Sequence, residues 1–253
     1  MLFDTHTHLD DKKFDEDRDT LIPSLKNDGI SLLVNIGADM KSSEESVKLA
    51  EKYDFIYASV GVHPCDTENL TDDDILTLEK LAQHEKVVAI GEIGLDYYWN
   101  EPEREIQKVW FKKQLMLAKK LNMPYIVHDR DAHADVLEII KESGYTNGVM
   151  HCFSGSAEMA KEVIKMGMYV SLSGTVTFKN AKKAQEVASV VPLDKLLIET
   201  DSPYLTPEPF RGKRNNSALV KYTAEKIAEI RGLSFEEVAR ITMENGKRFY
   251  NIK

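Results

Sequence analysis

The chain has 253 residues, of which 42% are hydrophobic and 30% are charged, and it carries a formal net charge of −9. No polar, Gly/Pro-rich linker divides it, so we expect residues 1–253 to form one domain with a well-buried core. The negative charge argues against tight, nonspecific binding of duplex nucleic acid, which needs many Lys and Arg side chains. It does not exclude a short anionic substrate held by a local basic loop.

The chain also lacks the sequence signals of export and membrane insertion. Its N-terminus has no basic region followed by an apolar stretch, as a signal peptide would. Charged residues or Asn interrupt every apolar run before about 18 residues, so we expect no membrane span. The two cysteines, Cys65 and Cys152, are too few for a disulfide framework. These features predict a cytoplasmic protein.

Short β-type runs alternate with helical patterns along the chain. We count about eight such runs, each short and apolar, as expected of strands buried on both faces of a parallel sheet. They are Met1 to Thr5, Leu32 to Ile36, Ile56 to Val62, Val87 to Ile90, Tyr125 to Val127, Gly148 to Met150, Tyr169 to Leu172 and Leu196 to Ile198.

Helical patterns fill the intervals between these runs. One example runs from Trp110 to Leu121, where apolar residues recur at helical spacing, and two more helices are expected near 217–231 and 234–250. About eight strand–helix units without a reversal in the pattern favour a closed TIM-like (β/α)8 barrel, of the α/β class, over an open doubly wound sheet.

Histidines concentrate just after the β-type runs. In a (β/α)8 barrel the active site forms at the C-terminal ends of the strands, where random placement over roughly 40 positions would put about one of seven histidines. Five of the seven lie there. His6 and His8 follow the first run, His63 the third, His128 the fifth and His151 the sixth, while Glu92 follows the fourth and Asp201 the eighth.

This bias predicts a divalent-metal centre. The His6-Thr7-His8 segment places two imidazoles on one side of an extended chain, because strand side chains alternate. Glu92 and Asp201 lie in apolar contexts, where an unpaired ionised carboxylate is costly. The predicted ligands are His6, His8, Glu92, His128, His151 and Asp201. Glu199, on the same side of the chain as Asp201, is expected to support a ligand rather than to be one.

Four histidines and two carboxylates are enough for two ions that share a bridging carboxylate. Such an arrangement activates water and stabilises both the attacking and the leaving oxygen in phosphoryl transfer. Mixed nitrogen and oxygen ligands suit Zn, Mn, Co or Fe, and a water-rich Mg site is an alternative. The sequence does not choose among these metals.

A basic segment follows the last β-type run. Residues 207–216 hold Arg211, Lys213 and Arg214, in a place where barrel loops often bind phosphate. We therefore expect a clamp for a phosphate-bearing substrate, with a solvated turn as the alternative. The aromatic residues Phe210 and Tyr97 to Trp99 offer stacking surfaces for bases, although aromatics at a barrel rim are more often packing residues.

Five motifs, in order along nearly the whole chain, resemble the TatD family of metal-dependent deoxyribonucleases, within the amidohydrolase-like barrels. They are Phe3-Asp4-Thr5-His6-Thr7-His8-Leu9-Asp10, Gly91-Glu92-Ile93-Gly94-Leu95-Asp96-Tyr97, His128-Asp129-Arg130, His151-Cys152-Phe153-Ser154-Gly155 and Glu199-Thr200-Asp201-Ser202-Pro203. Two positions depart from the family pattern: Tyr125, usually aliphatic, and Asn216-Ser217, often Glu-Pro. Neither is a predicted ligand.

The resemblance implies a TIM-like barrel with two divalent ions (Mg, Mn or Zn). It implies that His6, His8 and Asp201 hold one ion, that His128 and His151 hold the other, and that Glu92 bridges them. It further implies that Asp201 helps to activate water, that His63 and Arg130 contact the substrate phosphate, and that the loop of Arg211, Lys213 and Arg214 borders the substrate. The implied partner is DNA, as single strands or 3′ ends; the oligomeric state stays open, with a monomer as the simplest case.

Three functions are compatible with these residues. The favoured one is a 3′-to-5′ exonuclease on single-stranded DNA, with Glu92 and Asp201 as catalytic residues. The second is a hydrolase of a small amide, ester or lactone, or an aminoacyl-tRNA deacylase, that uses the same centre. Many such amidohydrolases bridge their metals with a modified lysine, so Glu92 and the cationic loop favour the nuclease. The third, a non-catalytic metal-binding protein, is disfavoured because all the ligands and the base are present.

Overall fold

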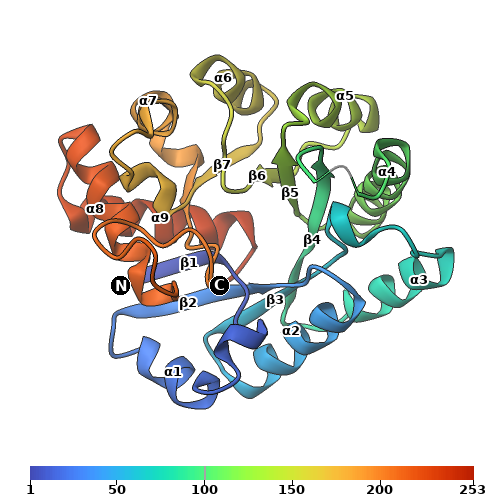
Figure 1. Ribbon diagram of the computed structural model, residues 1–253, viewed down its shortest axis with the longest axis horizontal. Coiled ribbons are helices and arrows are strands. Elements are labelled where there is room, and N and C mark those ends of the chain that lie inside the picture. The colour runs from blue at the N-terminus through green and yellow to red at the C-terminus, as the bar shows by residue number, and fades with distance from the viewer. Residues whose placement is uncertain (100) are drawn as a thin grey trace. The chain divides into compact units, whose positions relative to one another are not determined.

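The computed structural model of the protein describes residues 1–99 and 101–253. Within these residues, eight parallel strands alternate with helices, and their order follows the chain (Figure 1). The fold class is therefore the TIM-like (β/α)8 barrel that the sequence predicts. Contacts cluster into two compact units, which we describe one at a time. Unit 1 comprises Met1–Asn35, Cys152–Lys165 and Tyr169–Lys253, and unit 2 comprises Ile36–His151 and Met166–Met168.

Unit 1 contains the first two and the last two strands. These are β1 (Leu2–Thr7), β2 (Ile30–Ile36, whose last residue belongs to unit 2), β7 (Tyr169–Leu172) and β8 (Leu196–Ile198). β1 pairs with β2 and β7 with β8, both in parallel. The Thr5 hydroxyl donates a hydrogen bond of 2.9 Å to the carbonyl of Ile198, and Thr7 forms a parallel bridge with Ser202. The first strand thus lies beside the last, as expected in a barrel.

Unit 1 also contains the first helix and the last four α-helices. They are α1 (Arg18–Leu25), α6 (Ala157–Lys165), α7 (Lys182–Val190), α8 (Val220–Arg231) and α9 (Phe235–Phe249). A capping box between Ser234 and Glu237 starts α9, which packs against β1 and β8. Gly246 allows this close approach, because a Cβ atom there would lie 2.6 Å from the ring of Phe3.

Unit 2 contains the four middle strands, the helix that precedes them and the helices between them. The strands are β3 (Ile56–Val60), β4 (Val87–Asp96), β5 (Tyr125–Arg130) and β6 (Gly148–Met150). The helices are α2 (Met40–Lys52), α3 (Asp72–Leu81), α4 (Arg104–Leu121) and α5 (His133–Ser143). The four strands pair in parallel and in chain order. In the part of the chain described, no helix is long and apolar enough to cross a membrane.

β4 is longer than the sequence predicts. We expected it to end at Ile90, but the strand continues to Asp96, and all its residues are buried. Its register against β5 shifts between Ile90 and Ile93 and then continues to the pair of Asp96 with Arg130. Glu92 therefore lies inside the strand, at the shift, rather than after the strand's end. Glu92 and Asp96, in the second half of this strand, belong to the site described next.

Candidate metal centre

In unit 1, two imidazoles and one carboxylate converge. The Nε2 atoms of His6 and His8 lie 3.2 Å apart, and the Oδ1 atom of Asp201 lies 3.6 Å from the first and 3.5 Å from the second. Donor atoms that share one ion at about 2.0–2.1 Å are roughly 2.8–3.4 Å apart in octahedral or tetrahedral geometry. The triangle therefore fits a single divalent ion with little adjustment.

Strand geometry and local backbone contacts build this cluster. His6 and His8 share one face because the chain alternates, while Thr7 between them contacts the hydroxyl of Ser202 at 2.6 Å. The backbone N–H of Asp201 donates to the carbonyl of His6 at 2.9 Å. Asp201 has a φ of 55°, a left-handed conformation that is uncommon outside glycine and enriched in Asn and Asp. These contacts hold the carboxylate against the two imidazoles.

A buried carboxylate that we did not predict supports the same segment. Asp4 is fully buried and accepts hydrogen bonds from the backbone N–H of Thr200 at 2.9 Å and from its hydroxyl at 2.6 Å. Burial raises the pKa of Asp4 to about 7, although the hydrogen bonds of Ser217 and Thr200 oppose the rise. Asp4 thus links β1 to the segment that carries Asp201.

Glu199 is also buried, and it has a partner in the same unit. Its Oε1 atom accepts a hydrogen bond of 2.6 Å from the backbone N–H of Cys152. The Cys152 sulfur lies 3.2 Å from the hydroxyl oxygen of Ser173. This arrangement fits the supporting role that we expect for Glu199, because its hydrogen-bond partner Cys152 directly follows the predicted ligand His151 in the chain.

In unit 2, a second donor triangle surrounds Glu92. The Oε1 atom of Glu92 lies 2.7 Å from Nδ1 of His128 and 2.8 Å from Nε2 of His151, and these two nitrogens are 3.5 Å apart. The side chain of Glu92 is almost fully buried. An ionised carboxylate in such a place needs a cation or proton donors. The second triangle therefore also suits a divalent ion.

Asp96 orients His128 from the other side of its ring. Its Oδ2 atom lies 3.0 Å from Nε2 of His128. When Nε2–H donates to this carboxylate, the lone pair on Nδ1 is free to face a metal, as in the carboxylate–histidine–metal arrangements common in metalloproteins. Burial disfavours the charge on His128, but the hydrogen bonds to Asp96 and Glu92 outweigh burial and raise its pKa.

The sequence offered a signal for Asp96 that we did not use. It lies four residues after Glu92 on the same strand, so alternation places both carboxylates on one face. We missed it because we ended β4 at Ile90, which left Asp96 in a loop.

His63 is placed as a hydrogen-bond donor rather than as a ligand. Its Nδ1 atom accepts from the backbone N–H of Cys65 at 3.2 Å, so the proton of the neutral ring is on Nε2. That Nε2 lies 3.9 Å from Oε1 of Glu92. Burial first, and then the nearby His128, lower the pKa of His63 to about 3, which keeps the ring neutral.

Two buried glutamines of α4 hold the segments that carry these residues. The amide of Gln114 accepts from the backbone N–H of Val62 at 2.8 Å and donates to its carbonyl at 2.9 Å. Gln107 makes the equivalent pair with Asp96, at 2.8 and 3.0 Å. The sequence did not reveal either role, because each depends on a backbone partner on a distant strand end.

The predicted substrate-binding lysine and arginines differ in the side chains that they contact. Arg214 forms two contacts with Asp17, at 2.8 and 2.5 Å, which the sequence did not predict. Arg211 lies over the ring of Phe178 at 4.4 Å, and Lys213 lies 5.7 Å from the ring centre of Phe210; both are exposed. In unit 2, Arg130 lies 3.8 Å from the ring centre of Tyr98.

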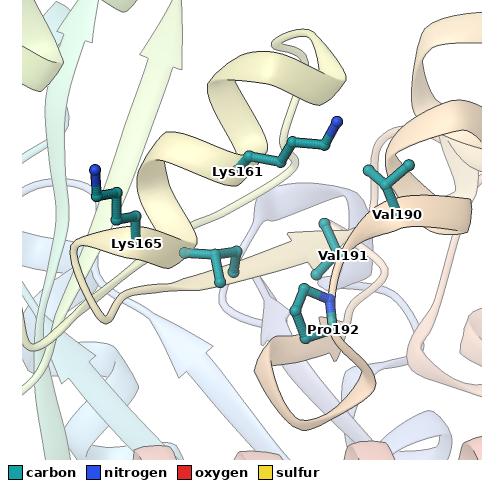
Figure 2. Close-up of a pocket in the computed structure, with 6 residues that line it drawn as sticks. Lys161, Lys165, Val190, Val191 and Pro192 are labelled. Atoms are coloured by element: carbon teal, nitrogen blue, oxygen red, sulfur yellow. The ribbon is translucent and has the colours of Figure 1, made fainter.

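A separate cavity of about 240 Å³ lies between α6 and the end of α7. Figure 2 shows that its lysines, Lys161 and Lys165, point to different sides, while Val191 and Pro192 supply apolar walls. Binding sites usually have a few convergent polar groups, which this cavity lacks. None of the candidate ligands lines it, so we place the chemistry at the strand ends instead.

These observations first define a class: a (β/α)8 barrel with groupings of histidines and carboxylates that could bind metal ions. Comparison with known proteins then identifies the family. The profile of the family described as TatD related DNase matches residues 3–251. The chain therefore belongs to this family of metal-dependent hydrolases.

Individual relatives agree with this assignment. The metal-dependent hydrolase YabD of Bacillus subtilis is 50% identical over 254 residues and covers both chains completely. YcfH of Escherichia coli K12, also named a metal-dependent hydrolase, is 38% identical over 258 residues, which is 100% of this chain and 96% of YcfH. The crystal structure of the Escherichia coli TatD homologue YjjV matches with a TM-score of 0.94 and 29% identity, over 100% of this chain and 98% of YjjV.

Proposed function

We propose that this protein is a deoxyribonuclease that uses divalent metal ions to cleave phosphodiester bonds, with single-stranded DNA and 3′ ends as substrates. One observation carries the choice of a phosphodiester. Arg130 follows the candidate ligand His128 by two residues on β5, and among the described residues its guanidinium forms no ion pair, only ring contacts with Tyr98 and Trp99. An arginine that forms no such ion pair, next to a cluster of candidate metal ligands, is suited to bind a phosphate group.

Each donor triangle would hold a divalent ion. His6, His8 and Asp201 would bind one, and His128, His151 and Glu92 would bind the other. When bound, such ions activate water and neutralise the charge that develops on the phosphate. Mg, Mn and Zn all suit this mixed set of nitrogen and oxygen donors.

The protein side chains would divide the remaining work. The carboxylate of Asp201, which is partly exposed, would accept a proton from the attacking water. The Nε2–H of His63 would donate to a non-bridging phosphate oxygen, and Arg130 would offset the charge of the phosphate. Asp96 would keep His128 in the tautomer and orientation that a ligand needs.

Metal-reconstituted protein incubated with 5′-labelled oligonucleotides, in single-stranded and duplex form, tests this function. We expect stepwise shortening of the single strand from its 3′ end, and none in EDTA. Small esters, lactones, amides and an aminoacyl-tRNA are assayed in parallel. Turnover of one of these with intact DNA would contradict the proposal and support the alternative hydrolase.

The variant Asp201→Asn tests the assigned base within the same assay. The substitution keeps the volume but removes the charge, so we expect hydrolysis to fall at least about 10³-fold. Asp28→Asn, an exposed position in the same unit, is the matched control and should retain activity. Near-normal turnover by Asp201→Asn would rule out its role.

A further inference from the structure

Two large aromatic side chains are exposed directly after β4. Tyr98 is 56% exposed and Trp99 is 63% exposed, and their rings meet edge to face with centres 5.0 Å apart. Large aromatic groups at the surface lose favourable burial, so an exposed Tyr–Trp pair usually marks a binding surface. The packing role that the sequence also allowed does not fit these exposures.

The backbone beneath these rings is firmly held. Oδ1 of Asp96 accepts from the N–H of Tyr98 at 3.0 Å and from that of Trp99 at 3.3 Å. The other oxygen of the same carboxylate contacts His128. On the preceding residue, the Tyr97 N–H donates to the carbonyl of Arg130 at 2.9 Å. One carboxylate therefore fixes the exposed pair relative to a candidate metal ligand.

Arg130 completes the surface. Its guanidinium carbon lies 3.8 Å from the ring centre of Tyr98 and 5.8 Å from that of Trp99. A guanidinium group that lies on an aromatic ring keeps the N–H groups at its edge available for a phosphate. An aromatic face for a base and a donor for its phosphate thus lie side by side.

We propose that Tyr98, Trp99 and Arg130 form a stacking platform that binds an unpaired nucleobase beside the phosphodiester to be cleaved. This inference rests on the proposed nuclease function and deepens it, because it assigns the preference for single strands to named residues. Any base can stack on an aromatic ring, whereas bases in a duplex are already stacked on each other. One stacked base contributes roughly 5- to 150-fold in affinity.

The test measures binding in EDTA, where hydrolysis is prevented. The probes are a fluorescein-labelled single-stranded hexanucleotide and a set of the same strands with one abasic sugar at successive positions. At one position, loss of the base should weaken wild-type binding by a factor within that range. Trp99→Ala should weaken binding of the intact strand similarly and show no further loss with that abasic strand, since the two changes remove the same contact.

Further variants distinguish a loss of stacking from a general loss of structure. Trp99→Phe keeps an aromatic face and should recover most of the affinity. Met116→Ala, at a 49% exposed position on α4 of the same unit, is the control and should bind as wild type does. Trp99 is also the exposed member of the two tryptophans, so the oligonucleotide should quench its fluorescence and leave that of the buried Trp110 unchanged.

Several results would overturn the platform: equal affinity of the wild type for intact and abasic strands, no binding of either, or an independent loss in Trp99→Ala with the abasic strand. Hydrolysis of bis(p-nitrophenyl) phosphate, a diester without a base, tests the proposed function separately. If the wild type cleaves that diester but shows no coupling between Trp99 and a base, the platform alone fails. If coupling is present and no phosphodiester is cleaved, the nuclease function alone fails.

Discussion

Asp96 shows how much a single side chain can organise. Its two carboxylate oxygens contact His128 on one side and the backbone of Tyr98 and Trp99 on the other, and Gln107 holds its own backbone. The pKa of Asp96 is lowered: burial favours its neutral form, but the hydrogen bond and charge of His128 outweigh this. The residue therefore stays an ionised acceptor, which is the state that can orient an imidazole N–H.

Replacement of Asp96 by Asn should weaken metal binding without unfolding the protein. Either the amide N–H₂ meets the N–H of His128, or the ring changes tautomer and loses its lone pair at Nδ1. We expect metal affinity to fall roughly 10- to 100-fold, as for other residues that orient a ligand. Isothermal titration with Zn²⁺ or Mn²⁺ measures the effect. Asp131→Asn, at an exposed position of the same unit, is the control, and equal affinities of the two variants would contradict this role.

The raised pKa of Asp4 predicts a pH dependence of stability in the metal-free protein. An acid with a pKa of about 7 in the folded state and 3.8 as its ordinary value favours the folded state most below pH 3.8. This contribution is lost as the pH rises to about 7. The difference of about three pKa units corresponds to roughly 4 kcal/mol as an upper bound.

Asp4→Asn removes this titration, so the stability of the variant relative to wild type should improve from pH 4 to pH 8. Urea unfolding in EDTA at several pH values measures the free energy of unfolding of both proteins. The titration of all other groups is common to both, so it drops out of the difference between them. A difference that does not vary with pH would show that Asp4 titrates normally.

At the scale of elements, β4 depends on a glycine that lets two strands approach. Gly94 has a φ of 146°, and a Cβ atom there would lie 2.0 Å from the carbonyl oxygen of His128. The substitution Gly94→Ala must therefore displace β5 near a candidate ligand. We expect a loss of roughly 2–4 kcal/mol in unfolding free energy, from overpacking and backbone strain together.

Gly144→Ala provides the matched control for this prediction. Gly144 also has a positive φ, of 60°, but it lies at the end of α5 with only a lysine side-chain atom at 4.0 Å from the added carbon. Its substitution should lower the free energy of unfolding by about 1 kcal/mol, because only the positive φ disfavours alanine there. Chemical denaturation distinguishes the two; equal losses would mean that the strands adjust freely.

Other elements show what the sequence alone could and could not predict. The bounds of β6, β7 and β8 match the prediction, because apolar runs between polar turns define them. β4 and β5 were predicted too short, because glycine and polar residues interrupt or end their apolar runs and resemble loops. They continue as strands because they pair with each other as far as Asp96 and Arg130.

The sequence also predicted only part of the candidate site. Proximity to apolar runs revealed the ligand candidates, and the structure brings them together within each unit. Asp4, Gln107 and Gln114 could not be found in this way, because each acts through a hydrogen bond to a segment far away in the chain. Nor could the sequence show that Arg214 is engaged by Asp17.

For the whole molecule, metal binding should contribute directly to thermal stability. An ion that binds only the folded state adds about 2.7 kcal/mol at a free concentration of 100 times its Kd. In a chain of 253 residues this raises Tm by roughly 5–10 °C. A thermal scan with and without EDTA measures the shift.

His6→Ala should show a much smaller rise on metal addition than the wild type. His84→Ala is the control, because His84 pairs with Glu51 at the surface, 3.1 Å away, and belongs to neither cluster. It should retain the full shift. A wild-type Tm that does not change between EDTA and excess metal would contradict ion binding by these clusters.

The contact between the first and last strands has a consequence for biosynthesis. Thr7 and Ser202 touch across 195 residues of chain, and their neighbours His6 and Asp201 belong to one cluster. A nascent chain therefore carries its first two histidines through nearly all of translation before the carboxylate that completes the cluster emerges. Fragments that stop short of Asp201 cannot complete the unit 1 cluster, so full metal loading becomes a property of the finished chain.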